Sequence, residues 1–289
     1  MNDPKIVDFE DGVAICGTFP QPDVLAIIDK HTEGKIPLTI ADPPYGNIVD
    51  KAWDRTNLSD QQFCQWMIDW TKVIETRSLE GSALYVWGGV GLARDGLKPP
   101  FRPFLRYLVE VELQTRYQLS TPITWKKKRA YGIQWGYLFV REELAYLVLG
   151  DHKKPRKFTV PLLDVKRGYA GYSEKYPAKS EFLRRTNVWD DVTEILKGKT
   201  HINQKPQRLM EIPIEVHTEP GEWVLDPFAG SGTTAFAARK LDRRFIIVEQ
   251  DPVEFEKIVT RLRDETKPQD LMGLLDDLEQ EPTETEKLR

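Results

Sequence analysis

Residues 225–234 read Leu225-Asp226-Pro227-Phe228-Ala229-Gly230-Ser231-Gly232-Thr233-Thr234 and join an apolar run to a helical pattern. Glycines at such a turn let the backbone pass close to a bound ligand. An acid, Glu249, ends the next apolar run, residues 245–248, and lies 17 residues beyond Gly232. An acid in that place can accept hydrogen bonds from both hydroxyls of a ribose. The pattern therefore predicts a strand, a nucleotide-binding loop and a helix.

Two other interpretations of this loop stay open. The loop also satisfies G-x-G-x-x-A through Gly230, Gly232 and Ala235, which is the pattern of a nicotinamide dehydrogenase. A lone match of this kind can also be a bare tight turn. A dinucleotide-binding fold builds most of its sheet after the loop, but only 57 residues follow Gly232. Most strands must therefore precede the loop, which predicts a circularly permuted order and disfavours the dehydrogenase.

Short apolar runs elsewhere end in Gly, Pro or Asp, as buried strands of an α/β sheet do. They span residues 36–40, 83–87, 122–125, 144–149, 223–225 and 245–248. Helical patterns follow a predicted N-cap at Ser59, cover about residues 207–217 and follow Gly232. Strands that alternate with helices predict an α/β fold with a doubly wound, mostly parallel sheet. Residues 151–186 fit this pattern poorly and form the candidate insert.

A second motif, Asp42-Pro43-Pro44-Tyr45, directly follows the apolar run at 36–40. The two prolines lack backbone donors, so their carbonyls and the Asp42 carboxylate present a corner that only accepts hydrogen bonds. Tyr45 adds an aromatic face. Such a corner suits a planar group with an exocyclic amine, such as adenine or cytosine. The alternative is a plain proline turn that Asp42 caps.

The net charge of −4 hides an uneven distribution. Residues 264–289 carry nine acidic and three basic residues, whereas residues 125–186 carry 15 basic and six acidic ones. Aromatic residues lie within the basic stretch, a mixture that suits a phosphate backbone beside bases. The alternative is a solvated, lysine-rich surface. The candidate DNA-binding residues are Lys126, Lys127, Lys128, Arg129, Lys153, Lys154, Arg156 and Lys157.

Length and composition exclude several classes of protein. The 289 residues suit one large domain, or one domain with a smaller insert. Two cysteines are too few for a disulfide framework or a cysteine metal site, and no metal is expected. The first residues lack the apolar stretch of a secretory signal, and no run approaches the roughly 18 apolar residues of a membrane span. We therefore expect a soluble, cytoplasmic protein.

The two motifs together resemble the amino-methylating DNA methyltransferases. Their order, with the catalytic tetrapeptide first and the cofactor loop last, resembles the circularly permuted β class of that family. Many members carry Gly-Asp before the catalytic motif, whereas here Gly17 is followed by Thr18. Further matches follow in the family's order over residues 14–252, namely Leu84-Tyr85-Val86-Trp87-Gly88-Gly89, Ile123-Thr124-Trp125-Lys126, Arg141-Glu142-Glu143, Asn187-Val188-Trp189-Asp190 and His201-Ile202-Asn203-Gln204-Lys205-Pro206.

The resemblance implies a permuted seven-stranded sheet. It also implies that a methyl group passes from S-adenosylmethionine to an exocyclic amine in double-stranded DNA, with the base flipped out of the helix. It places residues 1–150 in the catalytic half, 151–186 in a target-recognition insert, 187–263 in the cofactor half and 264–289 in an acidic tail. The implied catalytic residues are Asp42, Pro43, Pro44 and Tyr45. The implied cofactor-binding residues are Lys205, Asp226, Phe228, Gly230, Ser231, Gly232, Thr233 and Glu249.

Several points stay open at the level of sequence. Aspartate at position 42 favours N6 of adenine, but N4 of cytosine needs the same geometry. A DNA-binding relative that has lost catalysis is the alternative from another class. Lys205 is expected to neutralise the cofactor's carboxylate, with a surface lysine at a helix start as its alternative, and His201 is expected to be structural. The recognition sequence, a homodimer and a cognate restriction nuclease are also left open.

Overall fold

Strands and helices alternate along the chain. The structure is a computed structural model, and it describes residues 3–45, 58–88, 103–131, 137–166, 180–194 and 204–265. The strands are β1 (Lys5–Phe9), β2 (Gly12–Cys16), β3 (Ile36–Ala41), β4 (Ser78–Gly88), β5 (Tyr117–Tyr131), β6 (Phe139–Leu149), β7 (Leu162–Lys166), β8 (Phe182–Arg184), β9 (Val188–Trp189), β10 (Trp223–Asp226) and β11 (Arg244–Glu249). The helices are α1 (Pro22–Thr32), α2 (Asp60–Glu75), α3 (Pro103–Gln114), α4 (Arg208–His217), α5 (Thr233–Lys240) and α6 (Pro252–Glu265).

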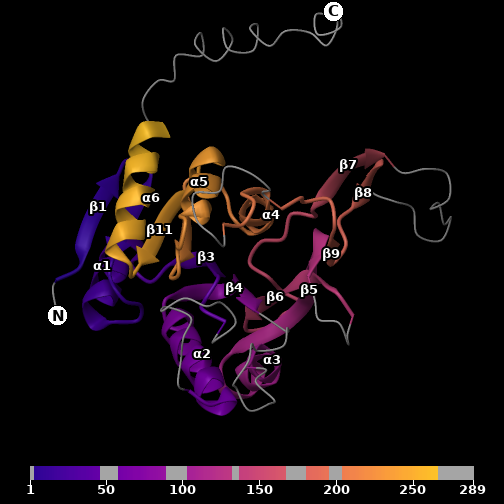
Figure 1. Cartoon of the computed structure of the whole chain (residues 1–289), viewed down its shortest axis with the longest axis horizontal. Coiled ribbons are helices and arrows are strands. Elements are labelled where there is room, and N and C mark those ends of the chain that lie inside the picture. The colour runs from indigo at the N-terminus through magenta and orange to yellow at the C-terminus, as the bar shows by residue number, and fades with distance from the viewer. Residues whose placement is uncertain are drawn as a thin grey trace, which may run out of the picture.

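A nine-stranded sheet runs through the molecule in the order β1-β2-β11-β10-β3-β4-β6-β5-β9 (Figure 1). Neighbouring strands from β2 to β4 are parallel. In contrast, β6 is antiparallel to both β4 and β5, and β1 is antiparallel to β2. The short β9 pairs in parallel with β5. The sheet is therefore mixed, with a parallel centre that contains both strands leading into the predicted motifs.

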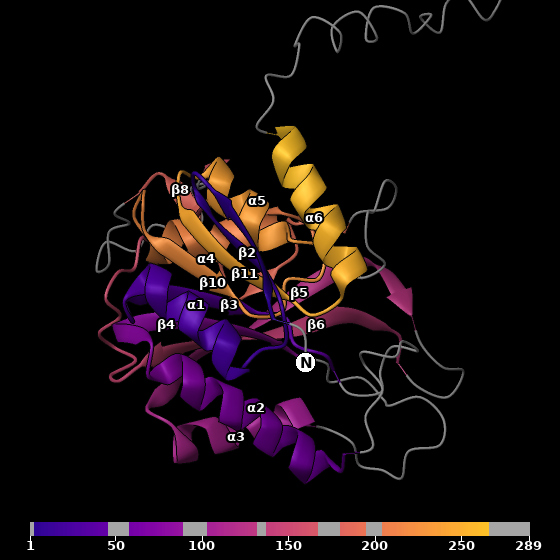
Figure 2. The same cartoon turned by 90° about the vertical axis from the view of Figure 1, so that its left-hand side faces the viewer.

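Helices cover the sheet on both faces, as a doubly wound fold requires. Successive side chains of a strand point to opposite faces, and β4 shows this plainly. Tyr85 and Trp87 belong to the core that includes α4, α5 and α6, whereas Leu84 and Val86 belong to the core that includes α1, α2 and α3. Figure 2 shows the two groups of helices on either side of the sheet.

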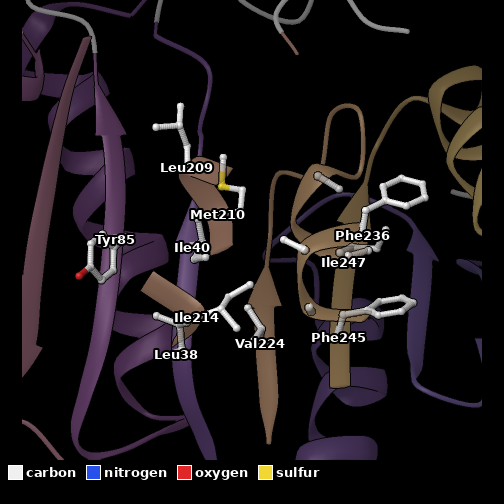
Figure 3. Packing of buried hydrophobic residues seen from close by; sticks show 14 of the residues in the cluster. Leu38, Ile40, Tyr85, Leu209, Met210, Ile214, Val224, Phe236, Phe245 and Ile247 are labelled. Carbon is white, nitrogen blue, oxygen red and sulfur yellow. The ribbon is translucent and has the colours of Figure 1, made fainter. Parts of the chain in front are cut away.

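Packing beneath α4 brings the segment before that helix close to the central strands. Leu209, Met210 and Ile214 of α4 belong to one buried cluster with residues of β3 and β10, and Ile214 lies between Leu38 and Val224 (Figure 3). All three are buried, and burying a side chain of this size contributes about 1.5–3 kcal/mol. Because Lys205 lies only three residues before α4, this packing also fixes the position of that lysine.

The elements predicted from periodicity are confirmed. Each of the six predicted apolar runs forms a strand, and the three predicted helices are α2, α4 and α5. Ser59 is the N-cap of α2 as expected: its hydroxyl accepts the backbone N–H of Gln62, and the Gln62 side chain accepts the backbone N–H of Ser59. Such a reciprocal cap stabilises a helix by about 1 kcal/mol.

Other elements are not predicted by the sequence patterns. Within the described residues the sheet has nine strands rather than seven, because the short strands β1 and β9 add to its two edges. Helix α1 buries only Val24, Ile28 and Thr32, one residue per turn. Such a narrow stripe gives a weak periodic signal. The circular permutation inferred from the order of the motifs stays a prediction.

The candidate insert contains a small sheet of its own. β7 and β8 form a two-stranded antiparallel sheet that projects beside the central sheet (Figure 1). At the other end, α6 continues through Asp264 and Glu265, so the acidic tail begins inside a helix. The rest of the acidic tail, residues 266–289, falls outside the described residues. Among the helices that are described, we find none with the length and apolarity needed to cross a membrane.

Candidate active site

The two motifs meet at the carboxyl edge of the parallel strands. β3 ends at Ala41, directly before Asp42, and β10 ends at Asp226. The two strands are parallel neighbours, with Leu38 opposite Val224. From β3 the chain goes on to β4 on one side, and from β10 to β11 on the other. This is the topological switch point of the sheet, where ligands of open α/β folds bind.

Asp42 has both carboxylate oxygens engaged. The Tyr45 hydroxyl donates to Oδ1 over 2.9 Å, and the Lys205 ammonium pairs with Oδ2. Lys205 Nζ also donates to the Tyr45 hydroxyl over 3.1 Å. Pro43 is buried, and Pro44 is partly buried. The structure therefore brings the four residues of the tetrapeptide together with a lysine that lies 163 positions further along the chain.

Lys205 is a buried cation. Its side chain is only 7% exposed, and its Nζ lies 4.6 Å from the centre of the Trp87 ring and 3.4 Å from the Glu142 carboxylate. Burial alone would lower the pKa of Lys205, but Asp42 and Glu142 outweigh burial and raise that pKa above its usual value. The ammonium therefore stays charged. Its described contacts are with the Asp42 corner, and its role toward the cofactor's carboxylate stays a prediction.

Glu142 is a site residue that the motifs do not single out. The antiparallel pairing of β5 and β6 places it opposite Trp125. Its Oε1 pairs with Lys127, and its Oε2 accepts the Tyr45 hydroxyl over 3.4 Å. Burial would raise the pKa of Glu142, but Lys205 and Lys127 together lower that pKa below its usual value. Glu142 is therefore a second carboxylate in the corner, and only the strand register brings it there.

Asp226 stabilises the glycine loop through hydrogen bonds to residues of the loop. It is buried, and its two oxygens accept the backbone N–H of Phe228 at 3.0 Å and the hydroxyl of Thr234 at 2.5 Å. Burial raises the pKa of Asp226 to about 7, although both hydrogen bonds oppose that rise. The hydroxyls of Ser231 and Thr233 lie 2.8 Å apart. These contacts fix the shape of the loop between β10 and α5.

The two glycines of the loop adopt left-handed backbone conformations. Gly230 has φ of 55° and Gly232 has φ of 76°, values that favour glycine. A Cβ on Gly230 would meet no heavy atom within 4 Å, so this part of the loop faces open space. A Cβ on Gly232 would instead lie 2.7 Å from Cγ2 of Ile258 in α6. The loop is thus open at Gly230 and closely packed at Gly232.

Glu249 lies beside the loop, at the end of β11. Its Oε2 accepts the backbone N–H of Gly230 over 2.7 Å, and its Oε1 accepts that of Asp251 over 2.8 Å. Burial raises the pKa of Glu249 to about 7, against the effect of these two hydrogen bonds. The acid that the sequence predicts for the ribose therefore sits at the open part of the loop.

Phe228 belongs to an aromatic cluster in the core. Its ring makes edge contacts with Phe19 and Trp70, at centroid distances of 6.0 and 5.4 Å, and a tilted contact with Trp66 at 5.9 Å. Its described contacts thus join the glycine loop to α2. Its predicted contact with a cofactor stays a prediction.

The first basic group continues β5 along the same edge as Asp42. The backbone N–H groups of Lys128 and Arg129 donate to the Glu194 carboxylate at 2.9 and 2.8 Å. Lys126, Lys128 and Arg129 are exposed, whereas Lys127 is partly buried against Glu142. Three of the four cations are therefore available to an anionic partner at the edge that carries the site.

The opposite edge of the sheet carries the second predicted basic group, Lys153, Lys154, Arg156 and Lys157. The backbone N–H of Arg156 donates to the carbonyl of Gly81, near the amino end of β4. Its guanidinium pairs with Glu222 at 2.7 Å, and Lys157 pairs with Glu219 at 2.6 Å. Both acids precede β10, whose carboxyl end carries the site. The structure therefore separates two basic groups that the sequence places in one stretch. His201 falls outside the described residues.

Comparison with known proteins identifies a family for this arrangement. A family model described as DNA methylase, of the N6/N4 type, matches residues 36–260. The matched part includes both the Asp42 corner and the glycine loop. The Type II methyltransferase M.BamHI of Bacillus amyloliquefaciens is 25% identical over 266 residues, which cover 87% of this chain and 58% of that protein. The chain thus spans less than two thirds of the length of M.BamHI.

Solved structures share the fold. The PvuII DNA methyltransferase, titled cytosine-N4-specific, superposes with a TM-score of 0.65 at 19% identity, covering 87% of this chain and 86% of that one. The M1.HpyAVI–SAM complex superposes with a TM-score of 0.52 at 21% identity, covering 84% of this chain and 97% of that one. At these identities the likeness concerns the α/β fold with its largely parallel centre.

Proposed function

We propose that this protein is a site-specific DNA methyltransferase that methylates an exocyclic base amine, with N6 of adenine as the first candidate. The chain belongs to the N6/N4-type DNA methylase family. One observation carries the proposal: the corner with the Asp42 carboxylate lies beside the glycine loop at the switch point of the sheet. A base amine and a methyl donor that occupy these two places would meet within one crevice.

The cofactor of this reaction is S-adenosylmethionine, and the residues of the loop fit it. The space at Gly230 admits a ligand close to the backbone, and the Glu249 carboxylate beside it can accept ribose hydroxyls. When bound, the cofactor supplies an activated methyl group. Asp226 acts through the loop, because its oxygens are both used to hold Phe228 and Thr234.

Asp42 and Pro43 orient the amine. An aniline-like amine is a poor nucleophile, because its lone pair is delocalised into the ring. If the Asp42 carboxylate and the Pro43 carbonyl each accept one N–H, the nitrogen becomes more tetrahedral and its lone pair turns toward the methyl group. The bound cofactor would supply its methyl group to this lone pair and leave as the neutral thioether, and the methylated amine would lose its extra proton to solvent. Asp42 therefore acts as an acceptor and need not be a strong base.

DNA must present the base outside the helix, because an amine inside a duplex is out of reach. Tyr45 lies next to Asp42 and supplies an aromatic ring that can stack on the flipped base. The exposed cations Lys126, Lys128 and Arg129 offset the unstacking cost of a few kcal/mol by binding phosphates. We assign residues 151–186, with the β7–β8 sheet, to target recognition. A homodimer and a cognate nuclease stay open.

N4 of cytosine is the second candidate substrate, since the same corner accepts either amine and the PvuII neighbour is titled cytosine-N4-specific. Expression in cells that lack adenine methylation, followed by sequencing of their DNA for modified bases, tests the function. Methyladenine in a fixed sequence context supports the proposal. N4-methylcytosine in that DNA would show that cytosine, rather than adenine, is the substrate. Unmodified DNA from a protein that binds S-adenosylmethionine would instead favour a catalytically inactive relative.

Cofactor binding is expected to depend on pH through Glu249. Its pKa is raised to about 7, so the group is mostly protonated at pH 6 and mostly a carboxylate at pH 8. A carboxylate accepts the ribose hydroxyls more strongly than the neutral acid, so affinity should rise as pH increases through 7, by roughly tenfold in all. Calorimetric titration with S-adenosylmethionine at pH 6, 7 and 8 measures this change. The variant Glu249→Gln should bind weakly and with a flat pH profile. A wild-type-like slope in that variant would assign the effect to another group, such as Asp226.

DNA binding is expected to depend on the exposed cations of β5. Charge reversal of Lys126, Lys128 and Arg129 should weaken DNA binding and lower the salt dependence of the affinity, by about one unit of log–log slope for each phosphate contact that is lost. Lys127 is left unchanged, because it holds Glu142. Fluorescence anisotropy over a range of salt concentrations gives the slope.

Reversal of Lys153 and Lys154 provides the matched comparison. These lysines are also exposed, but they lie at the opposite edge of the sheet. We expect a clearly smaller change in slope for this pair. An equal change in both variants would show that DNA contacts both edges. An unaltered slope in the first variant would show that Lys126, Lys128 and Arg129 do not bind DNA and form a solvated surface.

A further inference from the structure

Two hydrogen-bond donors in the catalytic corner are shared between two acids. The Tyr45 hydroxyl lies 2.9 Å from Asp42 and 3.4 Å from Glu142. The Lys205 ammonium pairs closely with Asp42 and lies 3.4 Å from Glu142. In both cases Asp42 is the nearer acceptor. Glu142 Oε2 therefore stands within reach of the same donors without holding either of them closely.

The role proposed for Asp42 competes with these contacts. If Asp42 accepts an N–H of the base amine, its charge is shared among three donors, because Oδ1 already receives the Tyr45 hydroxyl and Oδ2 the Lys205 ammonium. If the base also stacks on the Tyr45 ring, a shift of that ring would take its hydroxyl away from Asp42. A hydroxyl that leaves Asp42 in this partly buried corner needs another acceptor, because an unsatisfied buried donor is unfavourable.

Glu142 is held in the orientation that such an acceptor requires. Its Oε1 is fixed by Lys127, which leaves Oε2 directed at Tyr45 and Lys205. Its carboxylate also compensates the Lys205 charge, so that ammonium need not remain on Asp42. The next residue, Glu143, contacts Thr124 at 2.8 Å and Arg141 at 3.0 Å instead. Adjacent residues of a strand face opposite sides, so of these two acids it is Glu142 that faces the Asp42 corner.

We propose that Glu142 is a positioning residue: it takes over the Tyr45 hydroxyl, and a larger share of Lys205, when the base amine binds Asp42. This inference rests on the proposed function, because the incoming donor is the amine of the flipped base. It adds to the corner a carboxylate that does not touch the reacting atoms and acts through Tyr45 and Lys205.

The variant Glu142→Ala tests the proposal. We expect kcat for methyl transfer to fall by about tenfold to a hundredfold, the size of effect that small misplacements of reacting groups cause. The Kd for S-adenosylmethionine should stay unchanged, because Glu142 does not contact the glycine loop among the described interactions. Glu143→Ala, at the adjacent position on the same strand, is the matched control and should keep the wild-type kcat. A wild-type kcat in Glu142→Ala would overturn the proposal.

Removal of the Tyr45 hydroxyl separates positioning from a merely structural role. The variant Tyr45→Phe keeps the stacking ring but removes the donor that needs a second acceptor. Combined with Glu142→Ala, it should restore kcat by about threefold or more relative to Glu142→Ala alone, a coupling typical of residues in contact. Independent, multiplicative effects of the two substitutions would overturn the proposal. Failure of the wild-type protein to methylate any DNA would instead overturn the proposed function itself.

Discussion

Asp42→Ala is expected to lower the rate of methyl transfer by about a hundredfold to a thousandfold, the loss that follows removal of one key polar group at a reacting centre. Asp42 supplies the charged acceptor of the corner, and no backbone carbonyl can replace its charge. S-adenosylmethionine should still bind, because the glycine loop is braced by Asp226 and contacted by Glu249, not by Asp42. Single-turnover methylation of DNA and calorimetric titration of the cofactor measure the two quantities separately.

Asp42→Asn is the matched control for that experiment. The amide keeps the shape of the side chain and one acceptor oxygen, but it loses the charge that pairs with Lys205. We expect an intermediate rate and a fold close to that of the wild type. Because Lys205 is only 7% exposed, the alanine variant also leaves a buried ammonium with less compensation, so its folding has to be checked by circular dichroism. Wild-type turnover in a folded Asp42→Ala protein would show that methyl transfer does not require Asp42.

Gly232→Asp is expected to abolish cofactor binding, with a loss of at least about a hundredfold in affinity. The left-handed conformation of Gly232 costs a residue with a Cβ up to about 1–2 kcal/mol, although Asp tolerates it better than most residues. Its Cβ would lie 2.7 Å from Cγ2 of Ile258, so either α6 or the loop must shift. The new carboxylate would also be placed against the apolar Ile258 side chain. Displacement of the loop should therefore remove the cofactor-binding conformation.

Gly221→Asp separates this local effect from general strain. Gly221 has φ of 82°, but a Cβ there would meet nothing within 4 Å, and the residue lies in the turn before β10. This variant should lose stability to a similar extent as any residue forced into the left-handed region, yet it should bind S-adenosylmethionine normally. If Gly232→Asp titrates with wild-type affinity, the loop at 225–234 is not the cofactor site.

Local motifs account for what could be predicted of the site. Proline fixes the backbone after β3, and the glycines at 230 and 232 permit left-handed turns, so both motifs act through residues that are neighbours in sequence. Their placement on adjacent strand ends follows from the rule that ligands bind at the carboxyl edge of parallel strands. For this reason Asp42 and the glycine loop could each be assigned to a ligand site before the strand pairing was known.

Glu142 could not be predicted in this way. It lies 97 positions from Tyr45 in the chain, and nothing in its neighbours Arg141 and Glu143 distinguishes it. A shift of one residue in the pairing of β5 and β6 would turn Glu143 toward the corner instead. Register depends on the packing of the whole sheet, and so does the choice between these two acids.

The placement of the two basic groups is a second feature that could not be predicted from local sequence patterns. By sequence, residues 125–186 form one stretch with a net positive charge. In the structure, β6 is 11 residues long, runs antiparallel to β4 and carries the chain from the site to the opposite edge of the sheet. Lys126 and Lys153 therefore lie on opposite edges, although they are only 27 positions apart.

The sequence by itself determined the fold class, the family resemblance and the two motifs, because each depends on residues that are close together in the chain. Only the tertiary structure decided that Glu142 and Lys205 surround Asp42, and that one basic group rather than the other shares its edge. Those contacts join residues far apart in the chain. They are fixed by strand register and by the packing of α4, which no local pattern encodes.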